Sequence, residues 1–113
     1  SNWITIVSLE PIIIEPNSSY VVDTGLKFWL DSGTTALLME ASLPPVLRIV
    51  NKSLRGKTKL LIELYNTSDT RMILSTPIEI CYLIPLATAY FTNIELEEIN
   101  DAWFNASDSI AEI

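Results

Sequence analysis

Short apolar segments alternate with turn signals along most of the chain. β-Branched and apolar residues fill each segment, and Pro, Gly, Asn, Asp or Ser lies between most of them. The segments are Ile4–Leu9, Ile12–Ile14, Tyr20–Val22, Leu26–Leu30, Ala36–Met39, Val46–Val50, Thr58–Tyr65, Met72–Leu74, Glu79–Ile84 and Thr88–Phe91. Strands spaced about 8–12 residues apart are typical of sandwiches and jelly-rolls. The pattern therefore predicts an all-β fold.

The longest segment, Thr58–Tyr65, alternates as a strand with one buried face does. Leu60, Ile62 and Leu64 recur at every second position. Lys59 and Glu63 lie among the residues between them. Because strand side chains point alternately to two faces, we expect the three aliphatic residues to face the core.

The C-terminal segment has a different character. Residues 94–104 are acidic, and Leu96, Ile99 and Trp103 have a spacing that an amphipathic helix allows. An extended arm that docks on another subunit is an equal alternative. We therefore divide the chain into a β domain, residues 1–93, and an acidic C-terminal arm or short helix, residues 94–113.

Length and charge narrow the classes of partner. The chain has 113 residues, of which 49% are hydrophobic, so it can bury one core. Its net charge of −7 disfavours a broad nucleic-acid surface or anionic-membrane surface. No apolar run approaches the roughly 18–20 residues of a membrane-spanning helix. We expect no nucleic-acid partner and no membrane span.

Residue types limit the chemistry further. The chain has no histidine, and Cys81 is its only cysteine. This excludes an internal disulfide, a Cys/His zinc site and histidine-dependent nucleophilic catalysis. We expect Cys81 to be a packed core thiol, and we predict no metal and no cofactor. Basic residues also cluster near one turn, which is consistent either with a solvated hairpin or with an anion-binding site. They are Arg48, Lys52, Arg55, Lys57 and Lys59.

Residues 50–66 resemble the strand–turn–strand signature of the deoxyuridine triphosphatase (dUTPase) family. The family segment opens with an aspartate, continues with a tyrosine and an Arg-Gly turn, and follows a strand to an asparagine. The Arg55-Gly56 turn, the Thr58–Tyr65 strand and Asn66 match these features.

Weaker matches, in the family's order, extend the resemblance over nearly the whole chain. They correspond to the opening strands of the dUTPase family, to the turn after those strands, and to the family's second and fourth sequence motifs. The last match is to the segment that leads into the family's C-terminal arm. The matching segments are Pro11–Pro16, Val22–Leu26, Asp31–Gly33, Met39–Leu43, Pro77–Leu83 and Glu95–Asp101. The resemblance implies a dUTPase-like jelly-roll or β-sandwich.

The positions that carry catalysis in the family have other residues here. Asn51 stands in the place of the aspartate that activates water, and Leu54 in that of the tyrosine that stacks on uracil. Glu40 replaces a phosphate-binding arginine, where a carboxylate would repel a triphosphate, and Ser42 is retained. The fourth motif's Gly, Asp, Arg and Gln become Pro77, Ile78, Glu79 and Tyr82.

Two further parts of the family site are missing. The magnesium-holding aspartate of the first motif has no counterpart, and residues 101–113 contain no glycine for a nucleotide-wrapping arm. We therefore expect no catalytic residue. We take Glu40, Ser42, Asn51, Leu54 and Ile78 as remains of an ancestral site.

The resemblance also implies a homotrimer. Symmetric closure would cover the sheet edges that a small β domain exposes. We expect Trp103, Phe104, Ile99 and Tyr82 to contribute to trimer or partner contacts, because large apolar residues outside a core mark binding surfaces.

Three functional hypotheses follow. The first is a non-catalytic structural or interaction module, because small dUTPase-like domains with eroded sites occur in viral proteins. It would be a virion component, such as a capsid decoration or surface protein, found in the virion or host cell with viral or host partners. The second is a nucleotide-binding or hydrolysing relative that uses Ser42, Asn51, Arg55 and Asp23. The third is a regulatory binder of a host protein through the acidic tail.

Overall fold

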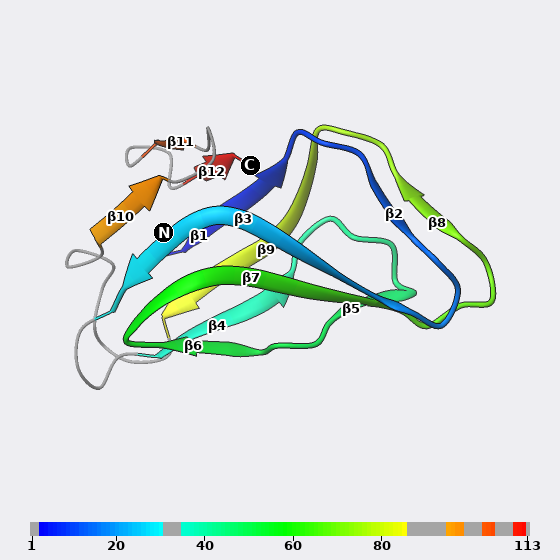
Figure 1. Ribbon diagram of the computed structural model, residues 1–113, viewed down its shortest axis with the longest axis horizontal. Helices are drawn as coiled ribbons and strands as arrows, with labels where there is room; N and C mark the ends of the chain where they lie inside the picture. The colour runs from blue at the N-terminus through cyan, green and yellow to red at the C-terminus, as the bar shows by residue number, and fades with distance from the viewer. Residues whose placement is uncertain (1–2, 31–34, 86–94, 99–102, 106–109, 113) are drawn as a thin grey trace.

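The computed structural model describes residues 3–30, 35–85, 95–98, 103–105 and 110–112. These residues form β-strands joined by turns and loops (Figure 1). No helix occurs among them. The expected all-β class is confirmed, whereas the finer dUTPase-like jelly-roll stays a prediction.

The strands form three sheets. The six-stranded sheet has the order β11 (Trp103–Asn105), β12 (Ile110–Glu112), β1 (Ile4–Ser8), β9 (Ile78–Pro85), β4 (Thr35–Glu40) and β6 (Ser53–Arg55). The four-stranded sheet has the order β10 (Glu95–Glu98), β3 (Ser19–Trp29), β7 (Lys57–Asn66) and β5 (Leu47–Ile49). β2 (Ile12–Ile14) and β8 (Met72–Leu74) form a two-stranded ribbon at one end of the molecule (Figure 1).

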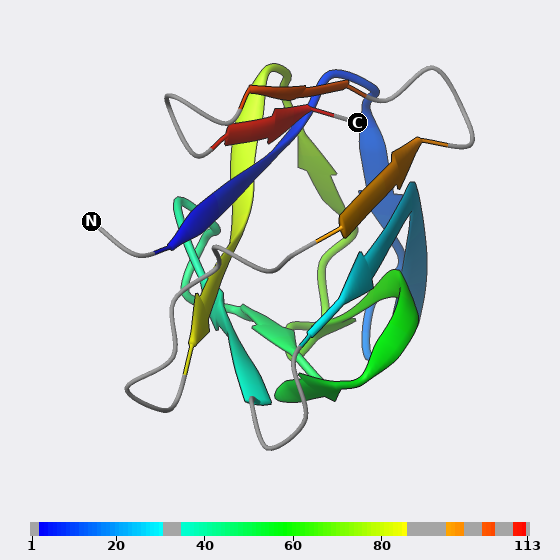
Figure 2. The ribbon, with the colours of Figure 1, turned by 90° about the vertical axis from the view of Figure 1, so that its left-hand side faces the viewer.

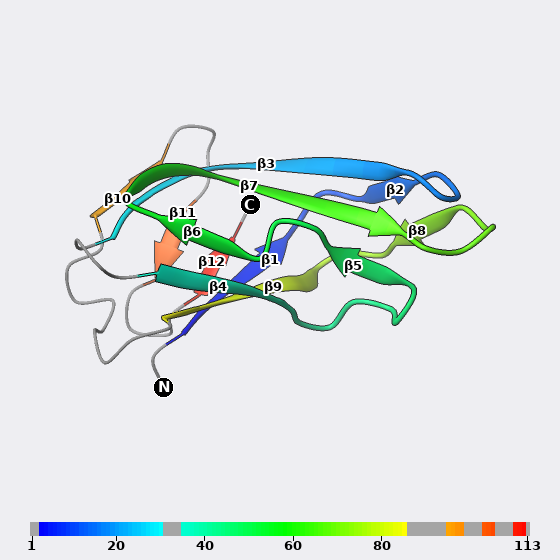
Figure 3. The same cartoon turned by 90° about the horizontal axis from the view of Figure 1, so that it is seen from below.

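The core lies between the two larger sheets, which form two layers in Figure 3. Leu60, Ile62 and Leu64 of β7 are all 0% exposed, so the predicted inward face of this strand is confirmed. They belong to one cluster with buried residues of the facing sheet, such as Ile6 and Leu83. Each such side chain stabilises the fold by about 1.5–3 kcal/mol relative to an exposed position.

β3 is one strand where the sequence pattern predicted two. Its register with β7 shifts in the middle, where Gly25 has a φ of 74°. The neighbouring Thr24 is buried, donating its Oγ1 hydrogen to the Leu60 carbonyl (2.8 Å) and accepting from the Leu26 N–H (3.1 Å). The Thr24-Gly25 signal therefore marks an irregularity inside a continuous strand, not its end.

The helix considered for residues 94–104 is wrong for the described part of that segment. β10 pairs antiparallel with β3, and β12 pairs parallel with β1 and antiparallel with β11. β11 and β12 continue the layer of β1, whereas β10 lies beside β3 (Figure 2). The edges of β1 and β3 carry backbone donors and acceptors that an extended segment satisfies and a helix cannot. Ile99 and Thr88–Phe91 lie outside the described residues.

Candidate functional site

Asn51 lies between β5 and β6, and its side chain binds the backbone of β7. Its Oδ1 accepts from the Glu63 N–H (2.8 Å), and its Nδ2 donates to the Leu61 carbonyl (2.7 Å). An amide satisfies both groups, whereas a carboxylate would satisfy only the N–H and would face the carbonyl without a proton. Asn51 thus continues the pairing along the edge of β7.

Leu54 is the middle residue of β6 and points into the core. It is 9% exposed, while Ser53 and Arg55 on either side are exposed. Because neighbouring strand residues point to opposite faces, this position presents no surface for base stacking, whichever residue occupies it.

Glu40 ends β4 and connects it to the opposite sheet. Its Oε2 accepts from the Ile49 N–H of β5 (2.7 Å) and lies 3.2 Å from Lys52 Nζ. Burial acts to raise the pKa of Glu40, but backbone N–H groups and Lys52 together outweigh it, and the pKa lies below its ordinary value. This carboxylate therefore bridges the two layers.

Glu40 should make the protein less stable in acid. A carboxyl whose folded pKa is lowered contributes stability above its unfolded pKa, near 4.5, and loses it as pH falls through the folded value. We expect Glu40→Gln to cost about 1 kcal/mol at neutral pH and less at pH near 3. Urea unfolding at both pH values measures this. A cost that is unchanged in acid would contradict the assignment.

Ser42 and Ile78 support the packing of β4 and β9. The Ser42 N–H donates to the Glu79 carbonyl (2.9 Å), and Ser42 Oγ lies 3.5 Å from Glu79 Oε1. Ile78 is half-buried against the core cluster. Together with Glu40, Asn51 and Leu54, these residues are accounted for by contacts within the fold.

The four residues considered for a relocated nucleotide site do not converge. Ser42 follows the end of β4, whereas Arg55 pairs with Thr35 at its start. At about 3.3 Å per residue, β4 separates them by roughly 20 Å. Asp23 lies on β3, where Lys59 (2.9 Å) and then the Gly25 N–H lower its pKa. Asn51 hydrogen-bonds the edge of β7 that faces β5, whereas β3, which carries Asp23, pairs with the opposite edge.

The basic cluster near the β6–β7 turn is partly neutralised. Lys59 pairs with Asp23, and Lys52 pairs with Glu40. These contacts favour the solvated hairpin over an anion site.

The expectation for Cys81 is confirmed: it is fully buried, and burial raises the pKa of its thiol to about 12, so it is not a nucleophile at neutral pH.

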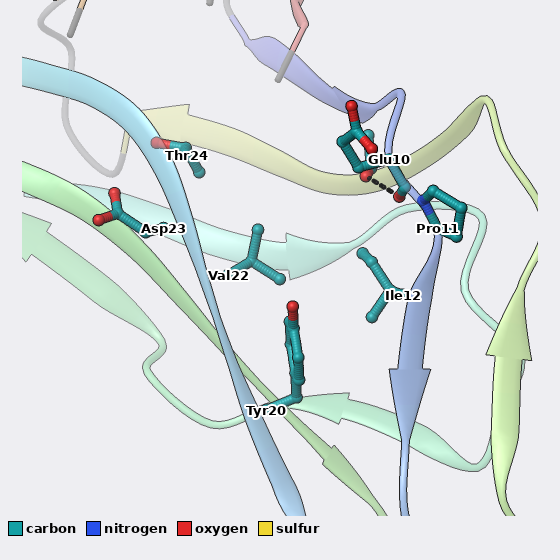
Figure 4. Close-up of a pocket in the computed structure, with 8 residues that line it drawn as sticks. Glu10, Pro11, Ile12, Tyr20, Val22, Asp23 and Thr24 are labelled. Atoms are coloured by element: carbon teal, nitrogen blue, oxygen red, sulfur yellow. Dashed lines mark hydrogen bonds between the residues drawn. The ribbon is translucent and has the colours of Figure 1, made fainter. Parts of the chain in front are cut away.

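A pocket of about 230 Å³ lies between β3 and the β1–β2 connection (Figure 4). Its lining is Ser8, Glu10, Pro11, Ile12, Tyr20, Val22, Asp23 and Thr24. Tyr20, Val22 and Ile12 point toward one another, while the Asp23 carboxylate points away from them (Figure 4). Two carboxylates and no basic side chain among these residues make the pocket a poor site for a polyphosphate.

Tyr82 is one of the residues expected to make partner contacts, and it lies on the outer side of the six-stranded sheet. Its ring meets that of Trp3 edge-on, with centroids 6.3 Å apart. Trp103 and Phe104 lie in β11, which pairs with β12 of the same chain. Ile99 is outside the described residues. Trimer contacts by these residues stay a prediction.

Strand register places further apolar side chains beside Tyr82. We call this set the outer apolar face: Trp3, Val7, Leu37, Met39, Tyr82 and Ile84. Met39 and Thr5 lie opposite Tyr82 on the two neighbouring strands, and Leu37 lies opposite Ile84. Directly paired residues share a face, so these side chains form a continuous surface.

From the sequence, Leu37, Met39 and Ile84 were not expected to be surface residues. The available signal was the near-continuous apolar character of Ala36–Met39 and Ile80–Ile84, in contrast to the alternation of β7. Such runs are expected where both faces of a strand are covered. Among the described strands, none lies over this outer face (Figures 2 and 3).

Two further findings concern metals and membranes. In the described part of the chain, no three His, Cys, Asp or Glu side chains are arranged to hold a metal ion. None of the described residues form a helix that could span a bilayer. Comparison of the chain with protein-family models, curated proteins and solved structures gave no match.

Proposed function

We propose that the protein is a non-catalytic interaction module that contacts other protein chains through the outer apolar face. The observation that carries this proposal is the apolar outer surface of the six-stranded sheet, over which no other described strand lies. Trp3 is 44% and Met39 43% exposed, and Leu37, Tyr82 and Ile84 are half-buried around them. Contiguous apolar surface on a small domain marks a binding site for protein.

The contrast with the other sheet supports this reading. On the outer side of the four-stranded sheet, apolar residues lie opposite charged ones: Val21 opposite Glu63, Leu61 opposite Asp23, and Tyr65 opposite Arg48. That mixture is what a sheet face in water requires. On the outer apolar face, Met39 lies opposite Tyr82 and Leu37 opposite Ile84, while a charged residue, Glu79, lies opposite Val7 at its end.

A non-catalytic role is supported by the structural contacts of the residues that stand at the family's catalytic positions. The Asn51 amide holds β7, the Glu40 carboxylate holds β5, and Leu54 is buried. Each does structural work that the family's catalytic residue type could not do in the same place. A dUTPase-like scaffold reused for assembly accounts for all three.

The resemblance alone supports the choice of a virion component, with viral or host proteins as partners. The alternative that uses the acidic tail on a basic partner is less well supported. Residues 95–98 and 110–112 of that tail are paired with β3 and β1.

Calorimetric titration with a non-hydrolysable dUTP analogue and magnesium tests the proposal. We expect no saturable heat at protein concentrations of roughly 50 µM, and no pyrophosphate release from dUTP. Magnesium alone, injected into the same protein, gives the baseline. Saturable binding in the micromolar range would replace the interaction module with the nucleotide-binding alternative.

A further inference from the structure

We propose that the outer apolar face binds the same face of a second copy of this chain about a two-fold axis. Arg55 of each copy then lies against Glu79 of the other. This inference rests on the proposed function and names its partner. It is carried by the pattern of charge around the face.

The middle of the face is apolar across neighbouring strands. One row has Tyr82 and Met39 on β9 and β4, beside the buried Thr5 of β1. The next row has Ile84 and Leu37 on β9 and β4, with Ser53 beside them on β6. Met39 is the most exposed apolar residue of these two rows and has an unbranched side chain that adapts to an opposing surface.

Charges of opposite sign lie at the two ends of the face. Arg55 lies opposite Thr35, on the outer side of β6 where β4 begins. Glu79 lies opposite Val7, on the outer side of β9 beyond the end of β4. Both side chains are exposed. About seven strand residues separate their levels, or roughly 23 Å along the strands.

This arrangement is complementary to itself. A two-fold axis that lies between two such faces, over the middle of β4 and perpendicular to the line from Arg55 to Glu79, exchanges the two ends. It places Met39 and Leu37 of each copy at the centre and sets each Arg55 over a Glu79. An interface of this kind is isologous and closes after two copies. A parallel superposition would instead place like charges together.

The size of the face sets the expected strength. Four strands at about 4.8 Å spacing and about 20 Å of length give on the order of 400 Å² of flat area per copy. This is at the low end of specific interfaces, so we expect a reversible dimer with a dissociation constant in the micromolar range.

Sedimentation velocity from about 5 µM to about 500 µM tests the dimer. We expect a concentration-dependent shift from monomer to dimer. Met39→Lys should weaken the association at least about tenfold, because it buries a charge at the centre of the pair. Val21→Lys is the matched control: it places the same charge on an exposed strand residue of the other sheet, and should leave the dimer unchanged. Thermal melts of both variants show that they fold.

Charge exchange tests the two-fold arrangement. Arg55→Glu and Glu79→Arg should each weaken the dimer by about fivefold, and the double variant should restore it to within about threefold. A monomer at every concentration overturns this inference, and so does a dimer that Met39→Lys does not affect. A trimer overturns the two-fold pair in favour of the assembly implied by the resemblance. None of these outcomes changes the nucleotide titration, which alone decides whether the protein is an enzyme relative.

Discussion

Asn66→Asp is expected to lower the free energy of unfolding by about 3–5 kcal/mol at neutral pH. The Asn66 side chain is fully buried. Its Nδ2 donates to the carbonyls of Ile14 (3.1 Å), Glu15 (3.2 Å) and Thr70 (2.7 Å). Its Oδ1 accepts from the N–H (3.0 Å) and the Oγ–H (2.7 Å) of Ser68. A carboxylate keeps only the two contacts with Ser68 and sets a buried charge against three carbonyl oxygens.

The pH dependence of this loss follows from the same geometry. Carbonyl oxygens and burial both disfavour the charged form, so the introduced carboxyl has a raised pKa in the folded protein. Stability is therefore present below the unfolded pKa of about 3.9 and lost as pH rises through the folded value. The difference between variant and wild type should shrink as pH falls from 7 toward 4.

Equilibrium unfolding in urea, followed by tryptophan fluorescence, measures both effects. Asn17→Asp is the matched control, because Asn17 is exposed in a turn with a φ of 52° that aspartate also tolerates. It should change stability by less than about 0.5 kcal/mol. If Asn66→Asp is as mild as the control, Asn66 does not hold the Ile14 and Thr70 segments together.

Asn66 shows what kind of feature the sequence predicts poorly. The strand that precedes it was predicted from the alternation of Leu60, Ile62 and Leu64, because a two-residue period reports burial directly. Asn66 was identified only as the end of a family segment. Its partners at Ile14 and Glu15 are 52 and 51 residues away. Such contacts depend on tertiary structure and leave no local pattern.

The C-terminal strands were missed for a related reason. Leu96, Ile99 and Trp103 fit a helical spacing, but a short isolated helix is marginal in water. The free edges of β3 and β1 offer hydrogen-bond partners to an extended chain, and β10 and β12 take them. An edge that recruits a distant segment is a property of the assembled sheet.

The candidate site likewise has a part that residue type predicts and a part that only the tertiary structure reveals. Residue type was enough to predict that Asn51 cannot act as a base and that Glu40 opposes a phosphate. The outer apolar face was not predicted as a unit. Its members come from β1, β4 and β9, and only the strand register brings Met39 beside Tyr82.

Leu54→Tyr, which introduces the tyrosine of the dUTPase segment that residues 50–66 resemble, is expected to destabilise the protein by about 2–4 kcal/mol and to create no nucleotide site. Leu54 is 9% exposed within the core cluster, so a larger ring must either displace its neighbours or leave its hydroxyl buried without a partner. Turning the ring outward would require β6 to slip by one residue, which would bury Ser53 and Arg55 instead.

Two controls separate position from residue type. Leu54→Met conserves volume and should cost less than about 1.5 kcal/mol. Ser53→Tyr places the same ring one residue earlier, on the exposed side of β6, and should change stability by less than about 0.5 kcal/mol. Urea unfolding of the three variants and titration of Leu54→Tyr with the dUTP analogue provide the readouts. If Leu54→Tyr were as stable as the wild type and also bound the analogue saturably, the tyrosine ring at this position would be able to stack on a nucleobase. That result would contradict the inward direction of the side chain. The inward direction of Leu54 argues for the opposite result, because Leu54 pairs with Ala36 of β4, and Ala36 is 0% exposed.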